Sequence, residues 1–211
     1  MLDELDRELE RRGHRFVRYA DDSNIYVRSR AAGQRVMKSV SGFITRRLKL
    51  KVNQSKSAVA RTAERKFLGF SISNAREPKR RIAPKALLRC KRKIRELTRR
   101  TRGISTKQMV EELASYLRGW RSYFGFCETP SVLRNLDQWL RHRLRSLIWK
   151  RWRRGTTRFR ELRKRGVNVA LAAQTAGSAQ GPWCLANSPA VSVALPTAYF
   201  DSLGLPRLFA G

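Results

Sequence analysis

Two neighbouring carboxylates, Asp21 and Asp22, stand in the stretch FVRYADDSNIYVRS, which runs from residue 16 to residue 29. Adjacent carboxylates on a rigid turn can hold divalent cations through hard oxygen ligands. Two such cations, roughly 4 Å apart, activate an attacking hydroxyl and stabilise a leaving phosphate in nucleotidyl transfer. Aspartate is also common at plain exposed turns, so the pair by itself leaves both interpretations open.

The remainder of the chain is strongly basic. Its 211 residues include 47 Lys and Arg against 16 Asp and Glu, a net charge of +31. Such a field attracts polyanions, and nucleic acid is the first candidate. The excess lies entirely in residues 1–166, because residues 167–211 contain one acid and one base. Three scattered cysteines, no apolar run of about 20 residues and no signal peptide predict a cytoplasmic protein with no membrane partner.

The elements that must position the carboxylates predict an α+β region over residues 1–78. Apolar residues at helical spacing precede Gly13, and two short apolar runs flank the acids, which would then lie at the tip of a β-hairpin. The expected elements are a helix before Gly13, strands at 16–19 and 24–27 joined at 20–23, a helix at 31–48, and short strands at 48–52 and 67–72.

Residues 79–166 predict a three-helix bundle. Pro84 suits the first turn of one helix that runs to about Arg100. Ser105 with Gln108 forms a capping pattern for a second helix, and a third begins at Thr129-Pro130. Stripes of leucine on the last two helices indicate a shared core, in which we expect Trp120, Tyr123 and Phe124 to pack. Residues 167–211, rich in Ala, Gly, Ser and Pro, predict a third region, an irregular tail.

The segment Tyr19-Ala20-Asp21-Asp22 resembles the Y-x-D-D motif of reverse transcriptases, in the form found in bacterial group II introns. Further segments follow in the order expected for that family: LKVNQSKS, FLGF, and SYLRGWRSYFGF at residues 115–126. The last is similar to the signature of the maturase domain, also called domain X or the thumb. The chain thus resembles the C-terminal part of a group II intron reverse transcriptase/maturase, with the end of the palm at 1–78 and the maturase-specific domain at 79–166. The tail at 167–211 would correspond to the family's C-terminal DNA-binding region, although it contains no specific motif.

This resemblance also implies roles for individual residues. Asp21 and Asp22 would hold the Mg²⁺ ions of a two-metal site, and Tyr19 would lie near the primer terminus or nucleotide. Lys56 would stabilise or protonate the departing pyrophosphate, although one more solvated base is an equal alternative. The primer would be positioned by Phe67, Leu68, Gly69 and Phe70, a segment that would otherwise be a core strand.

A complete palm in this family also has a further aspartate and a fingers region before the Y-x-D-D segment, and neither is found here. We therefore expect a truncated form of the protein, for which a separate chain would have to supply fingers and palm. The family consists of RNA-directed DNA polymerases, but we expect this chain by itself not to polymerise DNA.

Two stretches carry the positive charge of the helical region. Residues 79–102 contain twelve bases and one acid, and residues 134–165 contain thirteen bases and two acids. One-sided charge of this kind predicts a polyanion partner. The resemblance implies that this partner is group II intron RNA, bound to assist splicing, with a DNA target or primer as a second partner in the full-length family. The alternatives are a non-enzymatic basic RNA-binding protein with an incidental acidic hairpin, and a different palm enzyme such as a nucleotide cyclase. The candidate RNA-binding residues are Lys91, Arg92, Arg95, Arg118, Arg134, Arg141 and Arg145.

Overall fold

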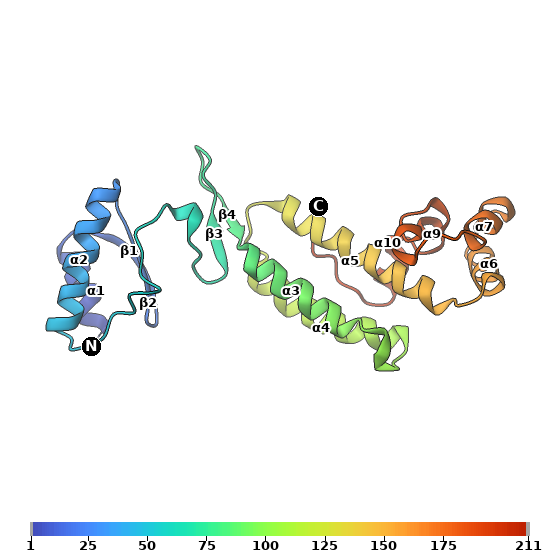
Figure 1. Cartoon of the computed structure of the whole chain (residues 1–211), viewed down its shortest axis with the longest axis horizontal. Helices are drawn as coiled ribbons and strands as arrows, with labels where there is room; N and C mark the ends of the chain where they lie inside the picture. The colour runs from blue at the N-terminus through green and yellow to red at the C-terminus, as the bar shows by residue number, and fades with distance from the viewer. Residues whose placement is uncertain (1, 210–211) are drawn as a thin grey trace. The chain divides into compact units, whose positions relative to one another are not determined.

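The computed structural model describes residues 2–209 of the chain. It divides into two compact units, Met1–Glu77 and Pro78–Gly211, which Figure 1 draws in blue to teal and in green to red. The first is an α+β unit and the second is almost entirely helical, in agreement with the predicted fold class. No helix within residues 2–209 is long and apolar enough to cross a membrane.

The first unit packs two helices against one face of a hairpin. Strand pairing brings Phe16 opposite Ile25, and both side chains pack on a core formed by Leu5, Leu9 and Val40. The hairpin is therefore held by the helices on both sides of it in the sequence. The elements are α1 (Leu2–Arg11), β1 (Arg15–Tyr19), β2 (Asp22–Tyr26), α2 (Arg30–Arg46), the 3-10 helix η1 (Thr62–Glu64) and β3 (Phe70–Ile72).

The strand predicted at residues 48–52 is wrong. These residues form an irregular connection in which Leu48 is buried and Leu50 packs against the same core as the hairpin. Lys49 between them has a φ of +58°, in the left-handed region that a strand excludes. The alternation of apolar and basic residues reflects two side chains anchored in the core of the first unit.

The strand predicted at residues 67–72 is only half correct. Phe67 and Phe70 exchange two backbone hydrogen bonds, of 2.8 and 2.9 Å, across Leu68 and Gly69. Both central residues have positive φ, +51° and +79°, which makes this a type I′ turn. Strand β3 begins only at Phe70, so the FLGF segment forms a tight turn with Leu68 exposed on it.

In the second unit the three predicted helices are present. Helix α3 begins at Pro84, the hydroxyl of Ser105 accepts a hydrogen bond from the backbone N–H of Gln108 at the start of α4, and α5 begins at Pro130. Trp120 and Phe124 are buried as expected, whereas Tyr123 is half exposed. The elements are β4 (Arg80–Ile82), α3 (Pro84–Leu97), η2 (Arg100–Arg102), α4 (Thr106–Phe124), α5 (Pro130–Arg151) and α6 (Gly155–Lys164).

The irregular tail predicted for residues 167–211 is wrong over its described part. It forms α7 (Val169–Ala176), α8 (Pro182–Leu185), α9 (Pro189–Ala194) and α10 (Thr197–Ser202). Helix α8 packs on α5, and α7 and α9 pack on α6. Leu195, Phe200 and Leu208 are buried, so this segment is part of the second unit's core. We call residues 167–209 the C-terminal layer.

Candidate nucleic-acid interface

The hairpin of the first unit carries the two carboxylates at its tip. Tyr19 pairs directly with Asp22, so the turn consists of Ala20 and Asp21 alone and Asp22 is the first residue of β2. This corrects the longer turn expected from the sequence. Ala20 has a φ of +52°, as tight two-residue hairpins require. Tyr19, Asp21 and Asp22 are all exposed.

The register of the hairpin also decides which side chains share a face. Successive residues of a strand point to opposite faces, and Phe16 points into the core. Tyr19 and its partner Asp22 therefore lie on the opposite, open face, together with Val17, which is 46% exposed. An aromatic ring and a carboxylate thus stand side by side on a face where both are exposed among residues 2–209.

The carboxylates of Asp21 and Asp22 are the oxygen ligands that Mg²⁺ prefers. Within residues 2–209, however, no group of three or more His, Cys, Asp or Glu side chains is placed to hold a metal ion. Two exposed carboxylates from one turn are an incomplete set for a two-metal centre. Metal binding by Asp21 and Asp22 therefore stays a prediction.

Arg18, which was not predicted as a site residue, holds the same turn in place. The guanidinium of Arg18 donates from Nη1 to the carbonyl oxygen of Ala20 at 2.9 Å. Its other edge forms a two-pronged ion pair with Asp6 of α1, with Nε 2.7 Å from Oδ1. The hydrogen bond from Arg18 lowers the pKa of Asp6 below its usual value. Helix α1 is thereby connected through one side chain to the backbone that carries the carboxylates.

Lys56 lies in a loop that Asn53 organises. The side-chain oxygen of Asn53 accepts hydrogen bonds from the hydroxyl of Ser55 at 2.8 Å and from the backbone N–H of Lys56 at 3.2 Å. The guanidinium of Arg65 donates to the carbonyl oxygen of Lys56, which fixes the loop from the other side. The side chain of Lys56 is exposed, and its role in the first unit stays a prediction.

Helices α3 and α5 of the second unit bring bases and an aromatic ring together. Lys91 Nζ lies 5.2 Å and the Arg95 guanidinium carbon 5.3 Å from the centroid of the Trp139 ring, distances typical of cation–π contacts. Arg143 donates to the hydroxyl of Thr98 at 2.7 Å. Burial lowers the pKa of Arg143, and the charge of Arg95 lowers it further. Lys91 and Arg95 were expected from the sequence, whereas Trp139 and Arg143 were missed.

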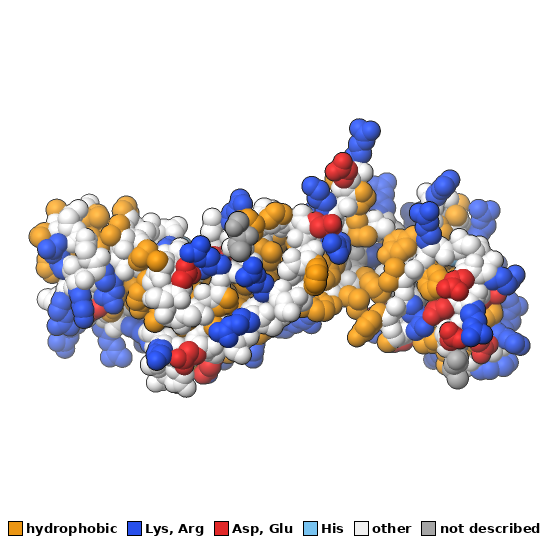
Figure 2. Space-filling view, turned by 180° about the vertical axis from the view of Figure 1, so that it is seen from behind, with side chains coloured by type: hydrophobic (Ala, Val, Ile, Leu, Met, Phe, Trp, Pro, Cys, Tyr) orange, Lys and Arg blue, Asp and Glu red, His pale blue; other side chains and the backbone are white. Residues whose placement is uncertain are grey.

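Other predicted RNA-binding residues differ in what surrounds them. Arg92 and Arg118 are exposed on α3 and α4. Arg134 is exposed on α5, and its guanidinium carbon lies 4.7 Å from the centroid of the Phe209 ring. Figure 2 shows Lys and Arg side chains, in blue, spread over one face of the helical unit.

Comparison with known families matches both units. The model described as "Reverse transcriptase (RNA-dependent DNA polymerase)" matches residues 1–72, and "Group II intron, maturase-specific domain" matches residues 87–166. The chain belongs to the group II intron reverse transcriptase/maturase family. The two matched regions lie in the order predicted from the sequence motifs and together cover well over half of the chain. No curated protein sequence matches the chain significantly.

Membership of this reverse transcriptase/maturase family sets the alternatives aside. An incidental acidic hairpin would not explain why residues 1–72 match the reverse transcriptase model as a whole. A nucleotide cyclase would not explain the maturase-specific domain that follows. The chain therefore combines a reverse transcriptase region with a domain whose role is RNA binding and RNA splicing.

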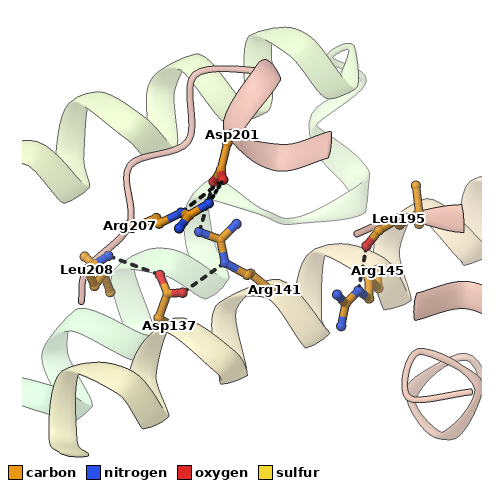
Figure 3. Close-up of polar contacts among 7 residues, drawn as sticks. All are labelled: Asp137, Arg141, Arg145, Leu195, Asp201, Arg207 and Leu208. Carbon is orange, nitrogen blue, oxygen red and sulfur yellow. Dashed lines mark hydrogen bonds and ion pairs between the residues drawn. The ribbon is translucent and has the colours of Figure 1, made fainter. Parts of the chain in front are cut away.

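Two predicted RNA-binding residues of the maturase-specific domain lie beneath the C-terminal layer (Figure 3). The Arg141 side chain is only 5% exposed and forms ion pairs with Asp137 at 2.9 Å and Asp201 at 3.3 Å. Arg145 donates to the carbonyl oxygen of Leu195 at 2.9 Å, and burial lowers its pKa. The sequence predicts Arg141 as an RNA-binding residue, but the structure buries its side chain, because Asp137 of α5 and Asp201 of the C-terminal layer pair with its charge inside the second unit.

Proposed function

We propose that the chain binds group II intron RNA through its maturase-specific domain and assists splicing by stabilising the folded RNA. In this proposal the RNA itself performs the transesterification, and the protein contributes binding energy alone. The observation that supports it best is the surface of α3 and α5, where Lys91 and Arg95 flank the ring of Trp139.

The composition of this surface fits structured RNA. Lys and Arg side chains that contact phosphates give affinity and salt dependence, but they do not read the nucleotide sequence. Proteins recognise folded RNA by shape and by unpaired bases that stack on aromatic rings or guanidinium planes. Trp139 with its two neighbouring cations offers both kinds of contact within one short stretch of helix surface. Arg92, Arg118 and Arg134 are exposed and complete the proposed contact set.

For the first unit we propose contact with a primer or DNA target. Asp21 and Asp22 would supply oxygen ligands to Mg²⁺, and Tyr19 beside Asp22 would lie against the nucleotide or primer end. The exposed turn formed by Phe67, Leu68, Gly69 and Phe70 would contact the primer strand. A bound Mg²⁺ would supply the Lewis acidity needed for nucleotidyl transfer, while the role of Lys56 would depend on its approach to the departing phosphate.

Binding to a group II intron RNA, measured across a salt series against an unrelated structured RNA of equal length, tests the RNA-binding proposal. We expect tighter binding to the intron RNA by about 10-fold or more at physiological salt. The double variant K91Q/R95Q should lose this preference, whereas R35Q/K38Q, which removes two exposed bases from α2, should retain it. Equal affinity of the wild-type chain for both RNAs would refute the maturase proposal and leave nonspecific binding.

A further inference from the structure

At one end of the helical bundle, two turns that are far apart in the sequence carry bases and no acid. The first, residues 99–107, connects α3 to α4 and contains Arg99, Arg100, Arg102 and Lys107. The second, residues 150–154, ends α5 and contains Lys150, Arg151, Arg153 and Arg154. Figure 1 draws the α3–α4 connection and the end of α5 at the same end of the bundle.

Arg151 joins the two turns directly. Its guanidinium donates from Nη1 to the hydroxyl of Thr106 at 2.6 Å and from Nη2 to the carbonyl oxygen of Ile104 at 2.8 Å. Because one side chain spans the gap, the backbone of the first turn lies within a side chain's length of the end of α5. The bases on both turns therefore belong to one surface, which we call the arginine corner.

Most bases of the arginine corner have no partner within the described part of the chain. The exceptions are Arg102, which binds Glu112 at 2.6 Å, and Arg151 with its two hydrogen bonds. Six exposed bases of the corner form no ion pair or side-chain hydrogen bond among residues 2–209: Arg99, Arg100, Lys107, Lys150, Arg153 and Arg154. Gathering six unpaired positive charges on two neighbouring turns costs stability through mutual repulsion unless a polyanion binds there.

The arginine corner also differs from the surface of α3 and α5 in having no aromatic ring to offer. Trp152, which lies within the second turn, is buried, and no large apolar side chain of residues 99–107 or 150–154 is exposed. Proteins hold the unpaired nucleobases of a single strand by stacking them on aromatic side chains. The backbone of a double helix, in contrast, can be held through phosphate contacts alone. The composition of the arginine corner therefore favours duplex RNA over single strands.

We propose that the arginine corner is a second RNA contact of the maturase-specific domain, one that binds the phosphate backbone of a double-helical segment regardless of its sequence. This inference rests on the proposed RNA-binding function and adds that two surfaces of the domain bind different parts of the RNA. The α3–α5 surface contacts structured elements with accessible bases, and the arginine corner holds an adjacent helix by charge.

Binding of the full chain to an RNA duplex of about 16 base pairs with arbitrary sequence tests this inference. The variant R99Q/R100Q/R153Q/R154Q removes four exposed charges from the corner. The control variant R28Q/R30Q/R35Q/K38Q removes four exposed charges from the first unit. We expect the corner variant to reduce the slope of log affinity against log salt by about 2 to 4, and to weaken duplex binding about 100-fold or more at 0.1 M salt.

The control variant should keep a slope close to that of the wild type, and binding of a single strand of equal length should change much less in the corner variant. A corner variant with the wild-type slope, or a control variant that loses as much, would overturn the inference. The outcome is separable from that of the maturase proposal, because the arbitrary duplex measures phosphate contacts while the comparison of intron with unrelated RNA measures preference. Loss of that preference with intact duplex binding would refute only the maturase proposal.

Discussion

Arg141 on α5 and Asp201 on α10 form an ion pair of 3.3 Å beneath the C-terminal layer (Figure 3). Asp201 also binds Arg207 at 2.6 Å, and the backbone N–H of Leu208 donates to Asp137, the second partner of Arg141. These contacts run from inside the matched maturase-specific region to residues beyond its end at 166. The folded domain therefore extends past the segment that the family model covers.

Replacing Asp201 with Asn should destabilise the second unit. The change leaves the buried guanidinium of Arg141 with Asp137 as its remaining acid partner and deprives Arg207 of its own. Loss of one partner from a mostly buried ion pair should lower the free energy of unfolding by about 1–3 kcal/mol. All five tryptophans lie between residues 120 and 183, so tryptophan fluorescence in a urea titration reports on this unit alone.

The matched control for this variant is Glu96→Gln, which breaks an exposed ion pair with Lys93 in the same unit. Exposed ion pairs contribute little to stability, so this variant should change the free energy of unfolding by no more than about 0.5 kcal/mol. If Asp201→Asn proved no more destabilising than Glu96→Gln, the interior position of Arg141 would not contribute to stability as we argue.

The sequence allowed prediction of elements whose signals are local. Pro84, Ser105 and Pro130 mark the starts of α3, α4 and α5 because a helix start depends on only a few neighbouring residues. The hairpin could also be predicted from the sequence, because its apolar side chains alternate on both sides of Asp21 and Asp22.

The sequence did not reveal features that depend on distant partners. The C-terminal layer consists of helices of four to eight residues, which are too short to be stable without packing on α5 and α6. Whether Arg141 faces RNA or the interior depends on Asp201, sixty positions further along the chain. Lys49 and Leu68 adopt positive φ, which their side chains disfavour. The residue types at these positions therefore did not predict the turns.

Acid should destabilise helix α1 in the first unit. Hydrogen bonds from Arg11 and Arg12 lower the pKa of Glu8 to about 2, from an ordinary value of 4.5. A carboxylate whose pKa is depressed by folding contributes stability that is complete above its unfolded pKa. We therefore expect amide hydrogen exchange in α1 to accelerate as the pH falls from about 5 towards 2, after correction for the intrinsic exchange rate.

The variant Glu8→Gln separates this effect from general acid denaturation. Its α1 should exchange faster than that of the wild type at pH 6, and the additional acceleration below pH 5 should be smaller, because the variant lacks the Glu8 carboxylate, whose pKa is depressed most clearly, and keeps that of Asp6. Identical pH profiles for the two proteins would show that Glu8 has no part in the acid response.

The three cysteines should differ sharply in reactivity. Cys90 is buried, and burial raises the pKa of its thiol to about 11, whereas Cys184 is exposed. The thiolate is the reactive form, so at pH 8 iodoacetamide should modify Cys184 first and leave Cys90 intact in the folded protein. Peptide mass mapping measures the order, and in urea all three should react at similar rates. Modification of native Cys90 as fast as Cys184 would contradict the packing of α3 against α4.

The hairpin tip leads to a prediction about polymerase activity. Within the described residues, Asp21 and Asp22 have no third metal-binding side chain beside them, and one turn alone does not enclose two cations. We therefore expect the purified 211-residue chain to make no cDNA in a primer-extension assay with Mg²⁺, although it binds the template. The variant D21N/D22N should bind RNA at least as well as the wild type, since it removes two negative charges from a basic protein. Robust Mg²⁺-dependent extension by the wild type that disappears in D21N/D22N would show instead that this pair of carboxylates suffices for catalysis.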